Sequence, residues 1–211
     1  MTFKYENQQL SGGYNYIIGC DEVGRGSLAG PVVAAAVILP VESYKVHKVI
    51  KFKEIRDSKL LSAEKREELS EFIKKHSLWS IGVVSQSLID KINIHNASLL
   101  AMKKAIDGLL CHPALDAGSS FIAIDGKFPI PNINHQQEAI IDGDNKVLSI
   151  AAASIIAKVY RDNLMRNLHQ DYPVYNFAQH KGYGTEYHRA MISSYGLSPI
   201  HRLSFCRNLA V

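Results

Sequence analysis

The chain has 211 residues, enough for one domain, and its 46% hydrophobic and 21% charged residues exclude collagen-like, disordered and disulfide-scaffold proteins. The formal charge is +4, but residues 145–211 hold eight Lys and Arg against three Asp and Glu, which suggests a polyanionic partner or, equally, a solvated helical surface. Three scattered cysteines and a start without an apolar segment exclude a zinc knuckle and a signal peptide and favour a cytoplasmic protein. The longest apolar run, residues 32–39, is too short for a membrane helix.

The first elements are predicted to be mostly strands. An aromatic and β-branched run indicates a strand at residues 14–20, and a glycine turn leads to a buried strand at 31–39. Ser62 is a suitable N-cap for a helix that ends at about residue 76, and a third strand is expected at 79–85. The short connection between the first two strands favours antiparallel pairing.

The second half alternates helices and strands. Apolar residues at helical spacing predict helices at 96–110 and 150–168. Short strands are expected at 121–125 and 137–142, and a turn-prone loop at 111–120. This alternation favours parallel strands added to the same sheet.

Together these elements predict an α/β fold, a mixed sheet flanked by helices. We expect a single domain over residues 1–211. Its last part, from about residue 170 to 211, is punctuated by glycines and basic, and is expected to form turns and short helices. No surplus apolar stripe stands out, so a monomer is expected.

Acidic residues stand at the ends of several predicted strands. Asp21 and Glu22 follow the first strand, Asp125 ends the strand at 121–125, and Asp144 precedes the long helix. Carboxylates at the carboxyl ends of adjacent strands converge at one edge of an α/β sheet. Four such charges repel one another unless hard cations neutralise them. The pattern therefore predicts two Mg²⁺ or Mn²⁺ ions and phosphodiester hydrolysis.

Each acid also has a plainer interpretation. Aspartates beside glycine commonly form turns, and Asp142 is the clearest example. Asp162 is expected to pair with a base. Neighbours on a regular strand point to opposite faces, so Asp21 and Glu22 reach one site only if the strand ends or twists there.

The turn after the first strand reads GRGSLA over residues 24–29, which matches the weak dinucleotide fingerprint. That fingerprint requires a helix next, whereas a proline and a β-type run follow. Exposed glycine backbone can instead approach a sugar-phosphate, and Arg25 can add charge at a phosphate. An ordinary hinge between two strands explains the spacing equally well.

The combination of motifs resembles the ribonuclease HII family over about residues 16–207. The matching segments are residues 21–26 (DEVGRG), 28–32 (LAGPV), 57–60 (DSKL), 124–126 (IDG), 143–144 (GD), 149–159 (SIAAASIIAKV), 161–162 (RD), 180–185 (HKGYGT) and 201–202 (HR) with Phe205. Only about 16 residues precede the first strand, which favours HII over the related HIII branch with its extra N-terminal domain.

The resemblance implies a ribonuclease H-like fold, with a mixed five-stranded sheet and a C-terminal helical extension. It implies an endonuclease that hydrolyses RNA in RNA/DNA hybrids and incises 5′ of single ribonucleotides in duplex DNA. Such enzymes use two metal ions, Mn²⁺ or Mg²⁺, and leave a 3′-hydroxyl and a 5′-phosphate. The expected partners are these nucleic acids.

The resemblance also assigns the candidate catalytic residues. Asp21, Glu22, Asp125 and Asp144 match the family's metal-binding carboxylates. Asp144 is preferred to Asp162 as the fourth because the family's acid precedes the long helix.

The substrate contacts carry over in the same way. Gly24, Arg25 and Gly26 match the turn that senses the ribose 2′-hydroxyl, and Tyr183 matches a tyrosine that stacks on a deoxyribose. Ser27 departs from the pattern, because many members carry proline there. The candidates for phosphate contact are Lys59, Lys158, Arg161, Lys181 and Arg202, with a structural salt bridge equally expected for Lys158 and Arg161.

Two other functions compete with this one. Another ribonuclease H-like nuclease would cut DNA that contains no ribonucleotide. A non-enzymatic hybrid-binding module would bind after Asp125→Asn and never cut, although such a module gains nothing from four acids that repel its anionic ligand.

Overall fold

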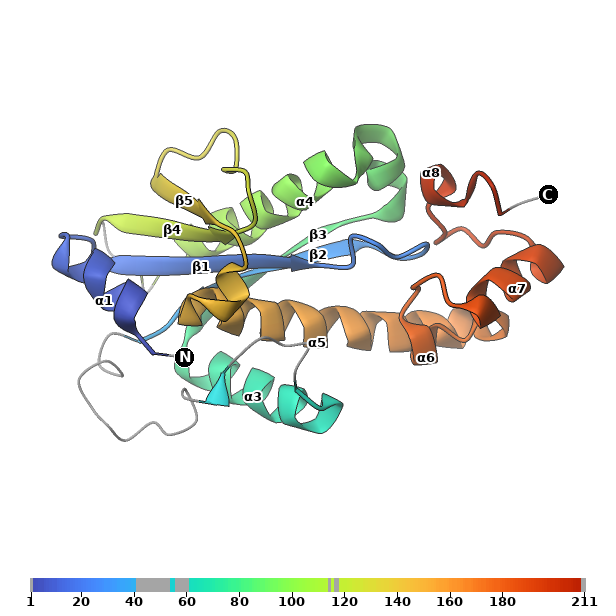
Figure 1. Ribbon diagram of the computed structural model, residues 1–211, viewed down its shortest axis with the longest axis horizontal. Helices are drawn as coiled ribbons and strands as arrows, with labels where there is room; N and C mark the ends of the chain where they lie inside the picture. Colours follow the sequence, from blue (N-terminus) through green and yellow to red (C-terminus); the bar gives the residue numbers. More distant parts are fainter. Residues whose placement is uncertain (1, 41–53, 56–60, 114, 116–117, 210–211) are drawn as a thin grey trace.

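A mixed five-stranded sheet, with strand order β3-β2-β1-β4-β5, forms the centre of the computed structural model (Figure 1). The structure describes residues 2–40, 54–55, 61–113, 115 and 118–209, so Lys59 and the DSKL segment lie outside it. The antiparallel strands are β1 (Tyr16–Val23), β2 (Val32–Ile38) and β3 (Leu78–Val84), and β4 (Ser120–Asp125) and β5 (Gln136–Ile140) run parallel to β1. The predicted pairing directions are therefore confirmed.

Helices cover both faces of the sheet. The helix α4 lies on one face, and α5 lies on the other with α3 beside it, while the C-terminal helices gather beyond the turn that joins β1 to β2 (Figure 1). The helical elements are α1 (Lys4–Ser11), α3 (Ala63–His76), α4 (Gln86–Leu110), η3 (Gly143–Asn145), α5 (Leu148–Asp171), η4 (Pro173–Tyr175), α6 (Phe177–His180), α7 (Glu186–Tyr195) and α8 (Leu203–Cys206). Within the described ranges, no helix is long and apolar enough to cross a membrane.

The middle strands are buried on both faces, as their continuous apolar sequences predict. Small residues let the helices lie close to the sheet. Ala34 and Ala36 of β2 pack in the cluster with α4, whereas Ala35 packs in the cluster with α5. At Gly19 of β1 a Cβ atom would lie 2.1 Å from the backbone of Ser149, so only glycine allows α5 to sit there.

Most predicted helices are confirmed, and α4 is the main exception. It begins ten residues before the predicted start at residue 96 because two helices join at Asn93, whose φ is 65° and ψ 165°. The Asn93 side chain accepts a hydrogen bond from the backbone N–H of Asn96 at 3.1 Å. The periodicity therefore identified the second helix and missed the one before the kink.

The short helix α1 was not predicted. It supplies the side chain that caps the N-terminus of the long helix α5. No side chain of its own caps α5 at Val147. Instead the carboxylate of Glu6, which is fully buried, accepts a hydrogen bond from the backbone N–H of Ser149 at 2.8 Å. A negative group at this end also suits the helix dipole.

Glu6 provides a test of this capping contact. Its pKa is raised, mainly by burial, so its contribution to stability is greatest below the unfolded pKa of about 4.3 and is lost as the pH rises through the folded value. We expect Glu6→Gln to be more stable than the wild type at pH 7, with the advantage disappearing near pH 4. Glu6→Ala, which removes the acceptor, should lose about 1–2 kcal/mol. Urea unfolding between pH 4 and 7 measures both.

Candidate active site

The first two acids lie within β1 and not after it. The strand was expected to end at residue 20, but it continues to Val23, and Asp21 and Glu22 pair with Ala35 and Ala34 of β2. They therefore point to opposite faces, as their adjacency predicts. Asp21 is buried and receives a hydrogen bond from Ser154 of α5, whereas Glu22 shares its face with the residues that pack toward α4.

The other two acids are joined through the backbone of a turn. Asp125 is the last residue of β4, and its carboxylate accepts a hydrogen bond from the N–H of Gly143 at 2.7 Å. A Cβ at position 143 would lie 3.2 Å from that carboxylate and 2.7 Å from Ile150, so glycine permits this close approach. The next residue, Asp144, is buried just before α5.

Asp21 lies within electrostatic reach of the other three carboxylates. Burial raises the pKa of Asp21 well above its usual value, and the charges of Glu22, Asp125 and Asp144 raise it further. Burial also raises the pKa of Glu22, with a further contribution from Asp125, while Arg25 acts in the opposite direction. Three further acidic side chains therefore gather around Asp21 at this end of the strands.

The nearest basic group offsets this charge only in part. The guanidinium of Arg25, half exposed, lies 2.7 Å from Oε1 of Glu22. The other oxygen, Oε2, is buried without a hydrogen-bond partner among the described residues. In that part of the chain no three Asp, Glu, His or Cys side chains are close enough to form a ready metal-binding group.

Two buried arginines hold the glycine turn between β1 and β2. Arg202 donates to the carbonyls of Gly24, Arg25 and Gly30 at 2.7–2.9 Å. Arg161 of α5 donates to the carbonyls at positions 29 and 31 at 3.2 and 3.0 Å. Gly24 has a φ of 91°, and a Cβ there would lie 2.1 Å from Arg161, so this glycine is required.

A second loop is joined to this turn. Arg161 also donates to the carbonyl of Lys181, and the N–H of Leu28 donates to the carbonyl of Gly182 at 2.8 Å. Ser27 pairs with Tyr183 as an isolated β-bridge. Arg25, Gly26 and the ring of Tyr183 are exposed, so the two loops present their polar backbone and one aromatic ring to solvent.

The expectation that Arg202 and Arg161 contact phosphate is not supported by their placement. Both side chains are fully buried, and their guanidinium nitrogens bind backbone carbonyls. Their role is to hold the turn. The equal alternative for Arg161, a salt bridge, is not found among the residues that the structure describes.

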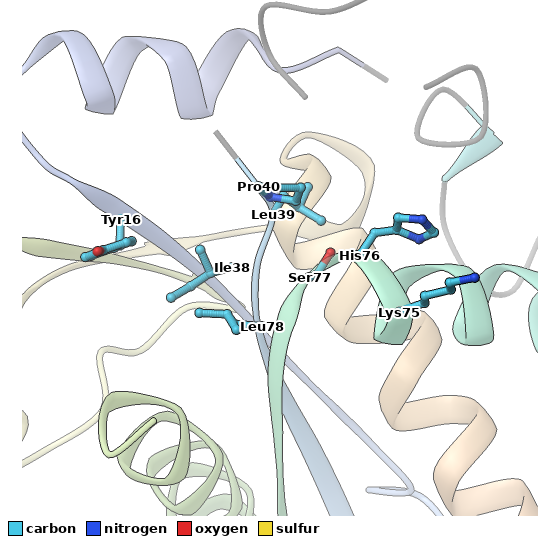
Figure 2. Close-up of a pocket in the computed structure, with 8 residues that line it drawn as sticks. All are labelled: Tyr16, Ile38, Leu39, Pro40, Lys75, His76, Ser77 and Leu78. Carbon is cyan, nitrogen blue, oxygen red and sulfur yellow. The ribbon is translucent and has the colours of Figure 1, made fainter. Parts of the chain in front are cut away.

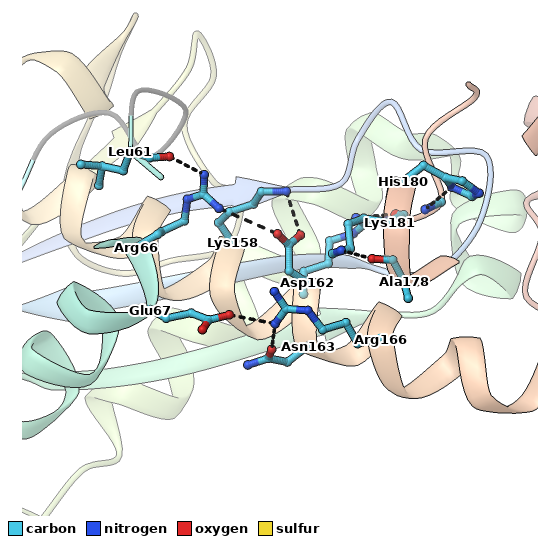
Figure 3. A network of polar contacts seen from close by, with 12 residues as sticks. Leu61, Arg66, Glu67, Lys158, Asp162, Asn163, Arg166, Ala178, His180 and Lys181 are labelled. Carbon is cyan, nitrogen blue, oxygen red and sulfur yellow. Dashed lines mark hydrogen bonds and ion pairs between the residues drawn. The ribbon is translucent and has the colours of Figure 1, made fainter. Parts of the chain in front are cut away.

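The long helix carries a network of ion pairs instead (Figure 3). Lys158 lies 2.7 Å from Asp162, which confirms that Asp162 pairs with a base, and Arg66 approaches the same carboxylate at 4.0 Å. Lys181 donates to the carbonyl of Ala178, and burial lowers the pKa of its amine.

Asp142 adopts a φ of 53° on the exposed turn before η3, which confirms its role as a turn residue.

Two hollows lie away from the acids. One of about 370 Å³ lies at the opposite end of β1, between Tyr16, the end of β2 and the start of β3 (Figure 2). The other, of about 560 Å³, lies between the kink of α4 and α8. None of the four acids lines either of these two hollows.

Comparison with known proteins decides the family. The family model of ribonuclease HII matches residues 18–208. The chain belongs to the ribonuclease HII family. The ribonuclease HII of Caldicellulosiruptor bescii is 45% identical over 98% of this chain and 94% of its own length, and that of Syntrophus aciditrophicus is 48% identical over 95% and 89%. The chain is therefore a ribonuclease H endonuclease.

Solved structures of more distant relatives confirm the fold. The ribonuclease HII in the PCNA:RNase HII complex from Archaeoglobus fulgidus has a TM-score of 0.71 at 24% identity, over 91% of this chain and 94% of that one. The Bst-RNase HIII in complex with Mn²⁺ has a TM-score of 0.71 at 20% identity, over 92% of this chain and 68% of that one. The predicted ribonuclease H-like architecture is confirmed.

The sequence analysis missed one contributor to the candidate site, Ser154, and assigned a different role to two others, Arg161 and Arg202. Ser154 lies within the quoted helical motif, but its contact with Asp21 is set by the distance between α5 and β1. The carbonyl-binding role of Arg161 and Arg202 could not be read from the sequence, because an arginine in a motif gives no indication of burial.

Asp21→Asn tests the electrostatic strain at this ribonuclease HII site. Because the pKa of Asp21 is raised by burial and by three neighbouring acids, its charged form destabilises the fold at pH 7. We expect the variant, in chelating buffer, to be more stable by about 1–2 kcal/mol in thermal or urea unfolding. Asp142→Asn, on the exposed turn, should be unchanged, and an Asp21→Asn variant no more stable than the wild type would contradict the account.

Proposed function

We propose that this ribonuclease HII binds RNA/DNA hybrids and ribonucleotide-containing duplex DNA, and incises 5′ of the ribonucleotide. Asp21, Glu22, Asp125 and Asp144 are the proposed catalytic and metal-binding residues. The observation that carries this proposal is that the fold places Glu22, Asp125 and Asp144 close enough to the buried Asp21 for their charges to raise its pKa, with Asp125 tied to the turn before Asp144. The chain is proposed to act as a cytoplasmic monomer.

The donor set fits divalent cations. Carboxylate oxygens are the ligands that Mg²⁺ and Mn²⁺ prefer, and Glu22 has a buried oxygen without a partner in the described part of the chain. Cations at this edge would also offset the charges that raise the pKa of Asp21. The bound ions supply the positive charge that hydrolysis of a phosphodiester requires.

Neighbouring residues hold the proposed ligands in place. The N–H of Gly143 fixes the carboxylate of Asp125, and Ser154 orients that of Asp21. No group of three ligands is preassembled among the described residues, and Glu22, paired with the exposed Arg25, is the carboxylate that would move on metal binding. Glu22 would then exchange Arg25 for an ion, which leaves the exposed guanidinium available for a substrate phosphate.

The glycine turn supports discrimination of RNA from DNA. The 2′-hydroxyl is both donor and acceptor, so backbone groups at Gly24, Arg25 and Gly26 can bind it. The arginines that hold the turn keep those groups at a fixed position relative to Asp21 and Glu22. Tyr183, on the adjoining loop, is exposed and is proposed to stack on the neighbouring deoxyribose.

A nicking assay tests the proposal. The substrate is a DNA duplex with one ribonucleotide, incubated with Mg²⁺ or Mn²⁺, and an all-DNA duplex serves as the control. We expect incision only 5′ of the ribonucleotide, with 3′-hydroxyl and 5′-phosphate ends. Asp125→Asn should lower the rate by at least about a thousandfold, because the electrostatic stabilisation of the reaction is lost.

The matched control is Asp142→Asn, an aspartate on the exposed turn before Asp144, which should cut at the wild-type rate. Cutting of the all-DNA duplex would identify a general nuclease. Binding of the hybrid without any cutting under either metal would identify the non-enzymatic binding module.

A further inference from the structure

Three buried histidines lie behind the loop that carries Tyr183. His180 ends α6, His188 lies in α7, and His201 lies in the turn before α8. The rings of His180 and His188 stack with centroids 4.4 Å apart, and Nε2 of His188 lies 3.0 Å from Nε2 of His201. None of the three is among the proposed catalytic or substrate-binding residues.

The hydrogen bonds assign one direction to this group. The backbone N–H of Ser198 can only donate, so Nδ1 of His201, at 2.9 Å, is an acceptor and its proton lies on Nε2. His201 therefore donates to Nε2 of His188, which must carry its own proton on Nδ1. That Nδ1–H donates to the carbonyl of Tyr183 at 2.9 Å. This series of hydrogen bonds runs from Ser198 through two neutral rings to the backbone of Tyr183.

Both ends of this series of hydrogen bonds lie beside segments that pair with the turn between β1 and β2. The backbone of Tyr183 pairs with Ser27, and the backbone of His201 pairs with Ala29. The two imidazoles therefore connect the two segments that make these pairings.

The surroundings keep both rings neutral. Burial lowers the pKa of His188 to about 4, and the charge of Arg189 acts in the same direction. Burial also lowers the pKa of His201 to about 4, with His180 as a contributor. A second proton on His188, at Nε2, would place two N–H donors opposite each other. The series of hydrogen bonds therefore requires the neutral form of His188.

We propose that His201 and His188 act as positioning residues. They hold the Tyr183 loop in the position in which its exposed ring contacts the nucleic acid. This inference rests on the proposed function, because it assumes that Tyr183 contacts the substrate. The two histidines do not touch the reacting atoms. Their effect should therefore be on substrate binding and not on the chemical step.

Two substitutions of His188 separate the two sides of its ring. In His188→Asn the amide nitrogen replaces Nδ1 and still donates to Tyr183, whereas in His188→Gln the amide oxygen replaces Nε2 and that donor is lost. Loss of one hydrogen bond, worth about 1.4 kcal/mol, corresponds to about a tenfold change. We expect His188→Gln to raise KM about tenfold with kcat changed less than about twofold, and His188→Asn to recover most of the loss.

A double variant tests whether the effect passes through Tyr183. In a Tyr183→Ala background, His188→Gln should change KM less than about twofold, because the positioned ring is absent. Equal effects of His188→Gln with and without Tyr183, or equal losses in the Gln and Asn variants, would show that His188 only stabilises the fold and would overturn the proposal.

Two further measurements keep this test distinct from that of the proposed function. Binding of the ribonucleotide duplex to Asp125→Asn, with and without His188→Gln, requires no cleavage and should show the same tenfold loss of affinity. Nitrogen-15 NMR of the free protein reports the tautomers directly and requires no substrate. Protons on Nε2 of His201 and Nδ1 of His188 are expected. The opposite tautomers would overturn the proposed role of the histidines even if the enzyme cuts as proposed.

Discussion

Two buried guanidinium groups hold the turn that follows Asp21 and Glu22. Arg161 and Arg202 come from segments far apart in the sequence, and together they bind carbonyls along the turn between β1 and β2 and the carbonyl of Lys181. Burial lowers the pKa of both groups, but an arginine remains protonated, so each carbonyl is bound by a charge-assisted donor. A turn of glycines has little preference of its own, and these contacts fix its shape.

The same helix that supplies Arg161 also supports the carboxylates. Ser154 of α5 contacts Asp21, and the turn before α5 carries Asp144 and the N–H that holds Asp125. The close approach of α5 to β1 depends on Gly19, and the start of α5 depends on Glu6. The acids and the turn between β1 and β2 are thus both attached to α5, and packing elsewhere in the fold offsets the electrostatic cost of the clustered acids.

Much of this could be predicted from the sequence because the signals are local. The strands and the helix α5 follow from apolar patterns, the pairing directions from the connections between strands, and Asp125 and Asp142 from their places beside glycine. What could not be predicted depends on contacts between distant segments. The strand β1 continues through Asp21 and Glu22 because β2 pairs with it there, and Arg202 is buried because its partners are carbonyls 172–178 positions away in the sequence. The histidine chain is likewise defined only when α7 meets the turn before α8.

The most direct test of the central claim is amide hydrogen exchange in Arg202→Lys. A lysine cannot bind three carbonyls at once in the geometry of a guanidinium. The account predicts that the amides of Leu28 and Gly30, which donate to Gly182 and Ile200 at 2.8 Å, exchange at least about tenfold faster, while those in the middle of β2 keep their protection. Unchanged exchange at Leu28 and Gly30 would show that the turn holds its shape without the arginine and would contradict the account.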